Sequence, residues 1–127
     1  MISRALTIAA ACSYLASCTL GLGVATGRWR TGRAHWLHHA LYISTAGTTA
    51  AATVALVAER GRRGAVLAPA LAPLAAIPYA GTRGWRHPAL AASVGPFIAA
   101  ALAVVARPAP EQTSRGGRRA HSGRGAR

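Results

Sequence analysis

The chain has 127 residues, of which 52% are apolar and only 13% are charged, with a formal net charge of +13. A soluble domain carries about a quarter charged residues of mixed sign, so this composition argues against a soluble globule. All basic residues are Arg, and Lys, Asp and Asn are absent, a usage typical of GC-rich bacterial genomes. The arginines lie in short clusters between long uncharged runs. Membrane proteins with several spans place their charges in this way, so we do not expect nucleic acid as the partner.

Four uncharged apolar runs are each long enough to cross a bilayer. A crossing helix needs about 20 residues, because the hydrocarbon core is about 30 Å thick and each residue rises about 1.5 Å. The predicted spans are residues 5–27, 36–58, 65–81 and 88–106. We therefore expect an all-α integral membrane protein with four transmembrane helices in a small antiparallel bundle. This transmembrane domain covers residues 1–106, and a disordered C-terminal tail covers residues 107–127.

The first run carries small residues at every fourth position of one face, a pattern that suits close approach of another helix. This ridge consists of Ala9, Ser13, Ser17 and Gly21. Gly23 and Gly27 add a G-x-x-x-G pair near the end of the run. We interpret these residues as helix packing within the chain, with a homodimer as the alternative.

A second interpretation of the first run is a lipoprotein signal sequence. Residues 15–18 read Leu-Ala-Ser-Cys, which resembles a lipobox, and Cys18 would then carry the lipid. The apolar run continues past Cys18, where a mature lipoprotein usually turns polar. We therefore favour a retained helix, with lipidation of Cys18 as the alternative.

The second run opens with the sequence His-Trp-Leu-His-His, and spacings of three and four residues place its histidines on one helical face. A further histidine opens the fourth run at the same predicted depth. We call His35, His38, His39 and His87 the histidine cluster. Histidine beside Trp and Arg at a membrane surface is most often an interfacial residue. The alternatives are a transition-metal site, or haem held by two axial imidazoles; no other cofactor is expected.

Hydroxyl groups continue along the same face of the second run. They belong to Tyr42, Thr45, Thr49 and Thr53. In lipid, such groups need partners in neighbouring helices or in the preceding turn of their own helix. We therefore expect this face to point into the bundle.

The third run contains Pro69, Pro73 and Pro78. Each proline removes a backbone N–H donor and crowds the carbonyl group four residues earlier. We therefore expect this helix to be bent or partly unwound. Neighbouring groups in the bundle should satisfy the freed carbonyl oxygens.

The last 21 residues are rich in Arg, Gly, Ser and Pro, so almost nothing there can be buried. The arginines of this tail are Arg107, Arg115, Arg118, Arg119, Arg124 and Arg127. Ten arginines flank the N-terminus, the second loop and the tail, against five on the other side, which predicts that both termini are cytoplasmic. In that position the tail faces anionic lipid headgroups, which we expect to be its partner.

Catalysis has few groups to use. An acid–base enzyme needs a positioned pair, and both glutamates, Glu59 and Glu111, are predicted on the side opposite the histidines. We expect a non-enzymatic structural or accessory component of a bacterial cell membrane that acts by contact with another, unknown membrane protein. The alternatives are a haem- or metal-binding redox module built on the histidine cluster, and a small transporter or channel. No Asp, Glu, Lys or Arg lies inside a predicted span, which argues against transport.

Overall fold

A computed structural model describes residues 1–29, 35–80 and 85–107, and every regular element in these ranges is a helix. The elements are α1 (Ile2–Ala25), α2 (His35–Arg60), the 3-10 helix η2 (Gly61–Ala70), α3 (Leu71–Ala76), the 3-10 turn η3 (Ile77–Tyr79) and α4 (Arg86–Ala106). The prediction of an all-α protein is confirmed. The arginine-rich tail beyond Arg107 lies outside the described residues.

Three helical stretches are long and apolar enough to cross a membrane, judged by length and composition. They are Ile2–Ala25, Trp36–Tyr79 and Arg86–Ala106. The second stretch is 44 residues long and contains both the second and the third predicted runs. These stretches are those of a multi-pass membrane protein.

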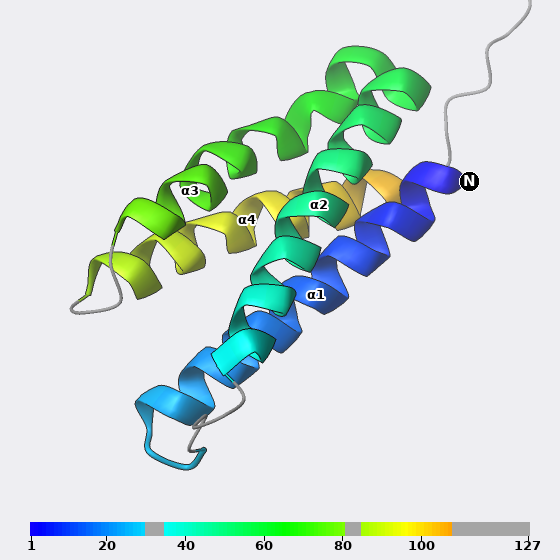
Figure 1. The fold of residues 1–127 in the computed structure, drawn as a ribbon. Helices are drawn as coiled ribbons and strands as arrows, with labels where there is room; N and C mark the ends of the chain where they lie inside the picture. Colours follow the sequence, from blue (N-terminus) through cyan, green and yellow to red (C-terminus); the bar gives the residue numbers. More distant parts are fainter. Residues whose placement is uncertain (30–34, 81–84, 108–127) are drawn as a thin grey trace, which may run out of the picture.

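The long stretch folds back on itself between α2 and η2, as the green ribbon in Figure 1 shows. Gly61 has φ +58°, a left-handed conformation that glycine adopts at little cost. Gly64 then lies directly against the backbone of α2, where a β-carbon would collide with the carbonyl group of Leu56. Two glycines therefore allow residues 61–79, which we call the return limb, to pack closely beside α2.

Four helical segments, namely α1, α2, the return limb and α4, form a ring in which each segment packs against two neighbours. α1 lies between α2 and α4, and the return limb lies between α2 and α4 on the other side. α2 and α4 are therefore diagonal to one another, and their Cα atoms stay more than 8 Å apart throughout the described residues. Any direct link between these two helices must come from long side chains.

The core of the ring is built from a few aliphatic side chains separated by alanines. Leu56 of α2, Leu67 of the return limb and Val94 of α4 are fully buried. Ala52, Ala70 and Ala101, also without exposed surface, let the backbones of the same segments approach closely. Van der Waals packing through small residues is how helices associate in lipid, so this core suits a membrane environment.

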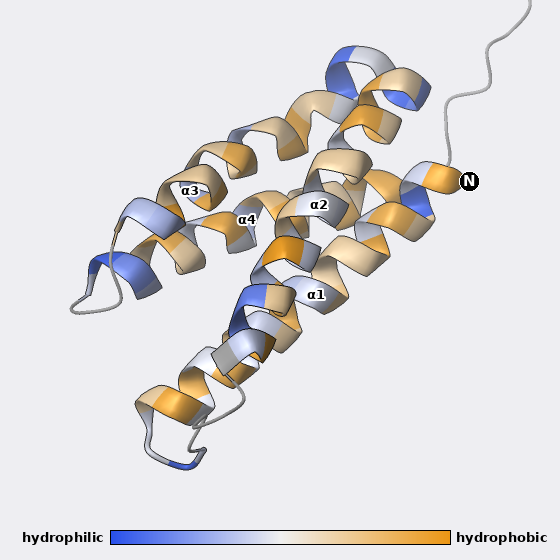
Figure 2. Ribbon diagram, in the orientation of Figure 1, coloured by the Kyte–Doolittle hydropathy of each residue, from blue (hydrophilic) through white to orange (hydrophobic). Residues whose placement is uncertain are grey.

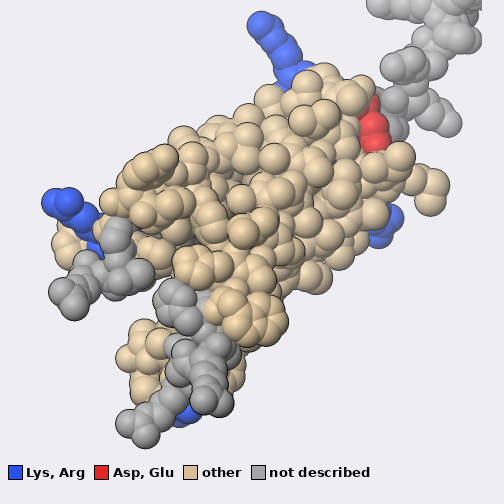
Figure 3. All heavy atoms as spheres, viewed as in Figure 1, with Lys and Arg blue, Asp and Glu red and all other residues tan. Residues whose placement is uncertain are grey.

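Polar and charged residues concentrate at the two ends of the bundle. In Figure 2 the hydrophilic residues lie mainly at the turns, and the segments between them are mostly apolar. Figure 3 shows the arginines and the acidic residue of this face near the ends, with an uncharged surface between them. We call the end where α2 and α4 begin the histidine end, and the end where α2 reaches Glu59 the glutamate end.

The return limb departs from regular α-helix, as its three prolines predict. Residues 61–70 and 77–79 are 3-10 helix, and only the six residues of α3 between them are α-helical. Proline removes the i to i−4 hydrogen bond on which the α-helix depends, which favours the tighter 3-10 turn. The prediction of a partly unwound helix is confirmed.

Candidate functional site

The histidine end brings together imidazole rings from two helices that are not neighbours in the ring. The ring centres of His38 on α2 and His87 on α4 are 6.0 Å apart, with an angle of 38° between the ring planes. His39 lies beside His38 at 6.3 Å in an edge-on arrangement. The side chain of His35 lies outside the described part of the chain. The side chains of His38 and His87 therefore meet between α2 and α4, whose backbones do not contact one another.

The three rings differ in their partners. Within the described part of the chain, the Nδ1 atom of His87 is buried and has no hydrogen-bond partner, whereas His38 and His39 each have an interaction partner. A buried ring nitrogen without a partner is uncommon in folded proteins. No group of three or more His, Cys, Asp or Glu residues could hold a metal ion among the residues that the structure describes. The arrangement thus offers two facing imidazoles and not a closed ligand set.

The hydroxyl-bearing face of α2 points into the bundle. Thr45, Thr49 and Thr53 are all buried. Thr45 donates to the carbonyl group of Leu41 and lies 3.1 Å from the hydroxyl of Ser17, while Thr53 donates to the carbonyl group of Thr49. The hydroxyl of Thr49 itself is buried and has no hydrogen-bond partner among the residues that the structure describes.

Tyr42 links α2 to the return limb through a carbonyl group that a proline has freed. Its hydroxyl donates to the Leu74 carbonyl oxygen at 2.9 Å. In an α-helix that oxygen would accept the N–H of residue 78, but residue 78 is proline and has no N–H. A side chain of the neighbouring helix therefore replaces the backbone donor that the sequence removes.

A second tyrosine links α1 to α4 in a similar way. The hydroxyl of Tyr14 donates to the Ala91 carbonyl oxygen at 3.0 Å. Gly95 provides the space, because a β-carbon there would lie 3.1 Å from this hydroxyl. Tyr14 has no distinguishing pattern around it in the sequence; Gly95 followed by Pro96 is the only local signal that a side chain could approach α4 here.

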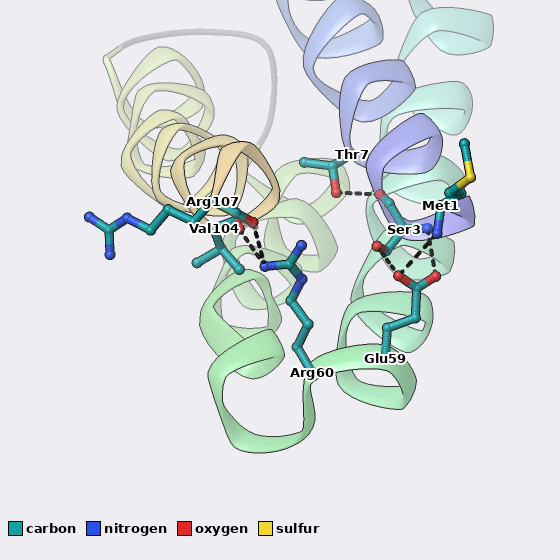
Figure 4. Close-up of polar contacts among 7 residues, drawn as sticks. All are labelled: Met1, Ser3, Thr7, Glu59, Arg60, Val104 and Arg107. Carbon is teal, nitrogen blue, oxygen red and sulfur yellow. Dashed lines mark hydrogen bonds and ion pairs between the residues drawn. The ribbon is translucent and has the colours of Figure 1, made fainter. Parts of the chain in front are cut away.

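At the glutamate end, Glu59 caps the start of α1 (Figure 4). One carboxylate oxygen accepts the backbone N–H of Ser3 at 3.0 Å, and the other accepts the Ser3 hydroxyl at 2.6 Å. The amino group of Met1 lies 3.5 Å from the second oxygen. The first N–H groups of a helix have no partner within the helix, and the helix dipole favours negative charge there. Glu59 supplies both requirements from another helix.

Arg60 caps the C-terminal end of α4 (Figure 4). One guanidinium nitrogen donates to the carbonyl oxygens of Val104 at 2.7 Å and Arg107 at 3.2 Å. The Val104 oxygen would ordinarily accept an N–H from residue 108, which is proline. Two consecutive residues at the end of α2 therefore cap α1 and α4, the first and the last of the described helices.

Two of the small residues of α1 contact α2. Ala9, Ser13, Ser17 and Gly21 are half-buried. The hydroxyl of Ser13 lies 3.1 Å from that of Ser44, and Ser17 pairs with Thr45 at the same distance. Ser13 and Ser17 of this ridge thus contact α2, whereas a β-carbon at Gly21 would meet nothing within 4 Å among the described residues.

The glycine pair at the end of α1 does not form a helix–helix contact within the described chain. Gly23 lies under the indole ring of Trp29, which would collide with a β-carbon at this position. Gly27 lies beyond the last residue of α1, with φ +70° and nothing within 4 Å of a β-carbon placed there. Cys12 is exposed and Cys18 is half-buried; both are free thiols.

The basic residues assigned to the tail are mostly outside the described part of the chain. Arg107 is described, and its carbonyl oxygen accepts from Arg60. Arg115, Arg118, Arg119, Arg124 and Arg127 lie outside the described residues.

Comparison of the chain with models of known protein families, with curated proteins and with solved structures finds no match.

Proposed function

We propose that this chain is a four-span protein of a bacterial cell membrane, with both termini cytoplasmic, that acts by contact with other membrane proteins and catalyses no reaction. The main support is that polar side chains of the described residues bind backbone groups of the same chain. Glu59 and Arg60 cap helix termini, and the hydroxyls of Tyr14 and Tyr42 bind backbone carbonyl groups. Groups with these roles stabilise the bundle, and the surface left for interaction is apolar.

The return limb is long enough to form a crossing of its own. A 3-10 helix rises about 2.0 Å per residue and an α-helix about 1.5 Å, so residues 64–79, which follow the arginines of the turn, span about 29 Å. The hydrocarbon core is about 30 Å thick. The turn that joins this limb to α2 carries Arg60, Arg62 and Arg63, a cluster typical of a cytoplasmic loop.

Tryptophans support the same orientation. Trp29, Trp36 and Trp85 all lie at the histidine end of the helices and are all exposed. Indole rings concentrate at membrane–water interfaces. We infer that the histidine end faces outward and that the glutamate end, with its arginine cluster and the tail beside anionic lipid, faces the cytoplasm.

The outer face of α2 is the surface that we propose for the contact. Ile43 and Val54 are 66% and 70% exposed, and between them Gly47 has open space where a β-carbon would be. A glycine between aliphatic side chains lets a second helix approach closely in lipid. We infer another membrane protein as the partner; a second copy of this chain would be detected by the same experiment.

Site-specific photocrosslinking in native membranes tests this function. A photoreactive amino acid is placed at Ile43, Gly47 or Val54, and as an interior control at Leu56, a large side chain that is fully buried. We expect one discrete protein adduct from the three outer positions and none from Leu56. Adducts with lipid alone at all outer positions would show that the contact function is wrong.

Cysteine labelling tests the proposed orientation separately from the contact function. In a chain with Cys12 and Cys18 replaced by serine, single cysteines are placed at Trp29, Arg62 and Ser122. A membrane-impermeant maleimide added to intact cells should label only position 29. Labelling of position 62 from outside would contradict the proposed orientation.

A further inference from the structure

The two imidazoles that bridge α2 and α4 lie at a separation suited to a shared ion. A nitrogen ligand lies about 2.0–2.1 Å from a bound transition metal, which places two coordinating ring centres about 5–6.5 Å apart. The observed separation of the His38 and His87 rings is 6.0 Å. These residues belong to diagonal helices whose backbones do not approach one another, so their side chains alone bring them together.

The buried face of His87 supplies the second observation. Its Nδ1 atom has no hydrogen-bond partner in the described protein, although burial makes an unpaired nitrogen costly. A metal ion would give this nitrogen a partner. His38 has an interaction partner of its own. A metal-bound histidine coordinates through one ring nitrogen and keeps the other for a hydrogen bond.

From this geometry we propose that His38 and His87 hold one divalent transition-metal ion of the Zn²⁺, Cu²⁺ or Ni²⁺ class across the diagonal of the bundle. Imidazole nitrogen suits these ions, whereas Mg²⁺ and Ca²⁺ require oxygen ligands. Glu59, the acidic residue of the described chain, lies at the opposite end of α2. The remaining coordination positions are filled by water or by an exchangeable ligand. This site is independent of the proposed contact function, because it lies at the histidine end, where α2 and α4 begin, and uses none of Ile43, Gly47 and Val54.

Zinc binding to the full chain, purified in mild detergent without a polyhistidine tag, tests the proposal. Equilibrium dialysis with Zn²⁺ should give one ion per chain. His38→Ala and His87→Ala should each weaken binding at least tenfold, and His121→Ala, a histidine of the tail, should leave it unchanged. Circular dichroism checks that each variant keeps its helix content. Absence of zinc binding by the natural chain, or equal binding by the His87→Ala variant, would overturn the site.

Chemical modification of the natural chain gives the same answer without relying on a variant that folds. Diethylpyrocarbonate acylates imidazole nitrogens, and mass spectrometry locates the products. Zinc should protect His38 and His87 from acylation and leave His121 reactive. Zinc-independent acylation of His87 would contradict the proposal. A Soret absorption band that disappears in the His38→Ala variant would assign the pair to haem and overturn the assignment to a metal ion alone.

Discussion

The hydroxyl of Tyr42 donates a hydrogen bond that a backbone N–H group donates in a regular α-helix. Pro78 leaves the Leu74 carbonyl group without its usual donor, and Tyr42 donates to it from the neighbouring helix. We expect Tyr42→Phe to lower the free energy of unfolding by about 1 kcal/mol, the typical net contribution of one such hydrogen bond. Unfolding by sodium dodecyl sulfate from detergent micelles measures this change. Tyr79→Phe is the matched control, because Tyr79 is 91% exposed.

A double-mutant cycle separates the proline from the tyrosine. Pro78→Ala restores an N–H that the Leu74 carbonyl oxygen can accept. In the Pro78→Ala background we therefore expect Tyr42→Phe to cost less than it does in the natural chain. Equal costs in both backgrounds would show that the tyrosine does not act by replacing the proline's missing donor.

Glu59 should control fraying at the start of α1. Its carboxylate accepts both the backbone N–H and the hydroxyl of Ser3. We expect Glu59→Ala to speed amide hydrogen exchange over the first turn of α1, and Glu59→Gln to have a smaller effect because the amide keeps one acceptor oxygen. Glu111→Ala, the same substitution in the tail, serves as the control. Unchanged exchange at Ser3 in the Glu59→Ala variant would refute the capping role.

At the scale of single residues, the sequence predicts which backbone carbonyl groups lack a donor, but not which side chain donates to them instead. A proline identifies the carbonyl group four residues earlier as lacking a donor. Pro78 therefore indicates that the Leu74 carbonyl oxygen, to which Tyr42 donates, needs a donor from elsewhere. It does not indicate which helix will supply the donor. Tyr14 and Arg60 act on backbone groups 77 and 44 residues away, and a backbone acceptor such as the Ala91 carbonyl looks like every other one in the sequence.

At the scale of elements, two glycines on the same stretch should respond in opposite ways to the same substitution. A β-carbon at Gly64 would collide with the backbone of Leu56, whereas one at Gly47 would meet nothing within 4 Å. We expect Gly64→Ala to destabilise the isolated protein by about 1–3 kcal/mol through overpacking. Gly47→Ala should stabilise it by up to about 1 kcal/mol, since alanine favours helix. The detergent-unfolding measurement compares the two; a loss of equal size at both positions would contradict the close packing at Gly64.

The helices themselves could be predicted because bilayer thickness and apolar composition together set their length. α1 and α4 lie within a few residues of the predicted runs. The prolines also predicted an irregular third element. Its division into 3-10 and α-helical parts could not be predicted, because the close approach at Gly64 and the hydrogen bond from Tyr42 depend on a neighbouring helix. The four histidines suggested a cluster, but only the ring order of the helices shows that His38 and His87 face one another across a diagonal.

At the scale of the whole molecule, side chains connect α2 and α4 at both ends although the two backbones stay apart. His38 and His87 meet at the histidine end, and Arg60 binds the last carbonyl groups of α4 at the glutamate end. We expect Arg60→Ala to lower the free energy of unfolding by about 1.5–3 kcal/mol, because a charge-assisted bond is lost and carbonyl oxygens are left without a donor. Thermal unfolding in detergent measures the loss. Arg62→Ala removes the same charge from the same turn and should have little effect; equal losses would attribute the stability to charge alone.

The double capping at the end of α2 has a consequence for biosynthesis. Glu59 reaches back to a helix that has already left the ribosome, so the first hairpin can be completed at once. Arg60 needs a carbonyl group that is synthesised 44 residues later. The guanidinium group of Arg60 therefore cannot bind this carbonyl oxygen until α4 has been inserted. The contact between Glu59 and α1 can therefore form early in membrane insertion, whereas the contact between Arg60 and α4 can form only after α4 has been made.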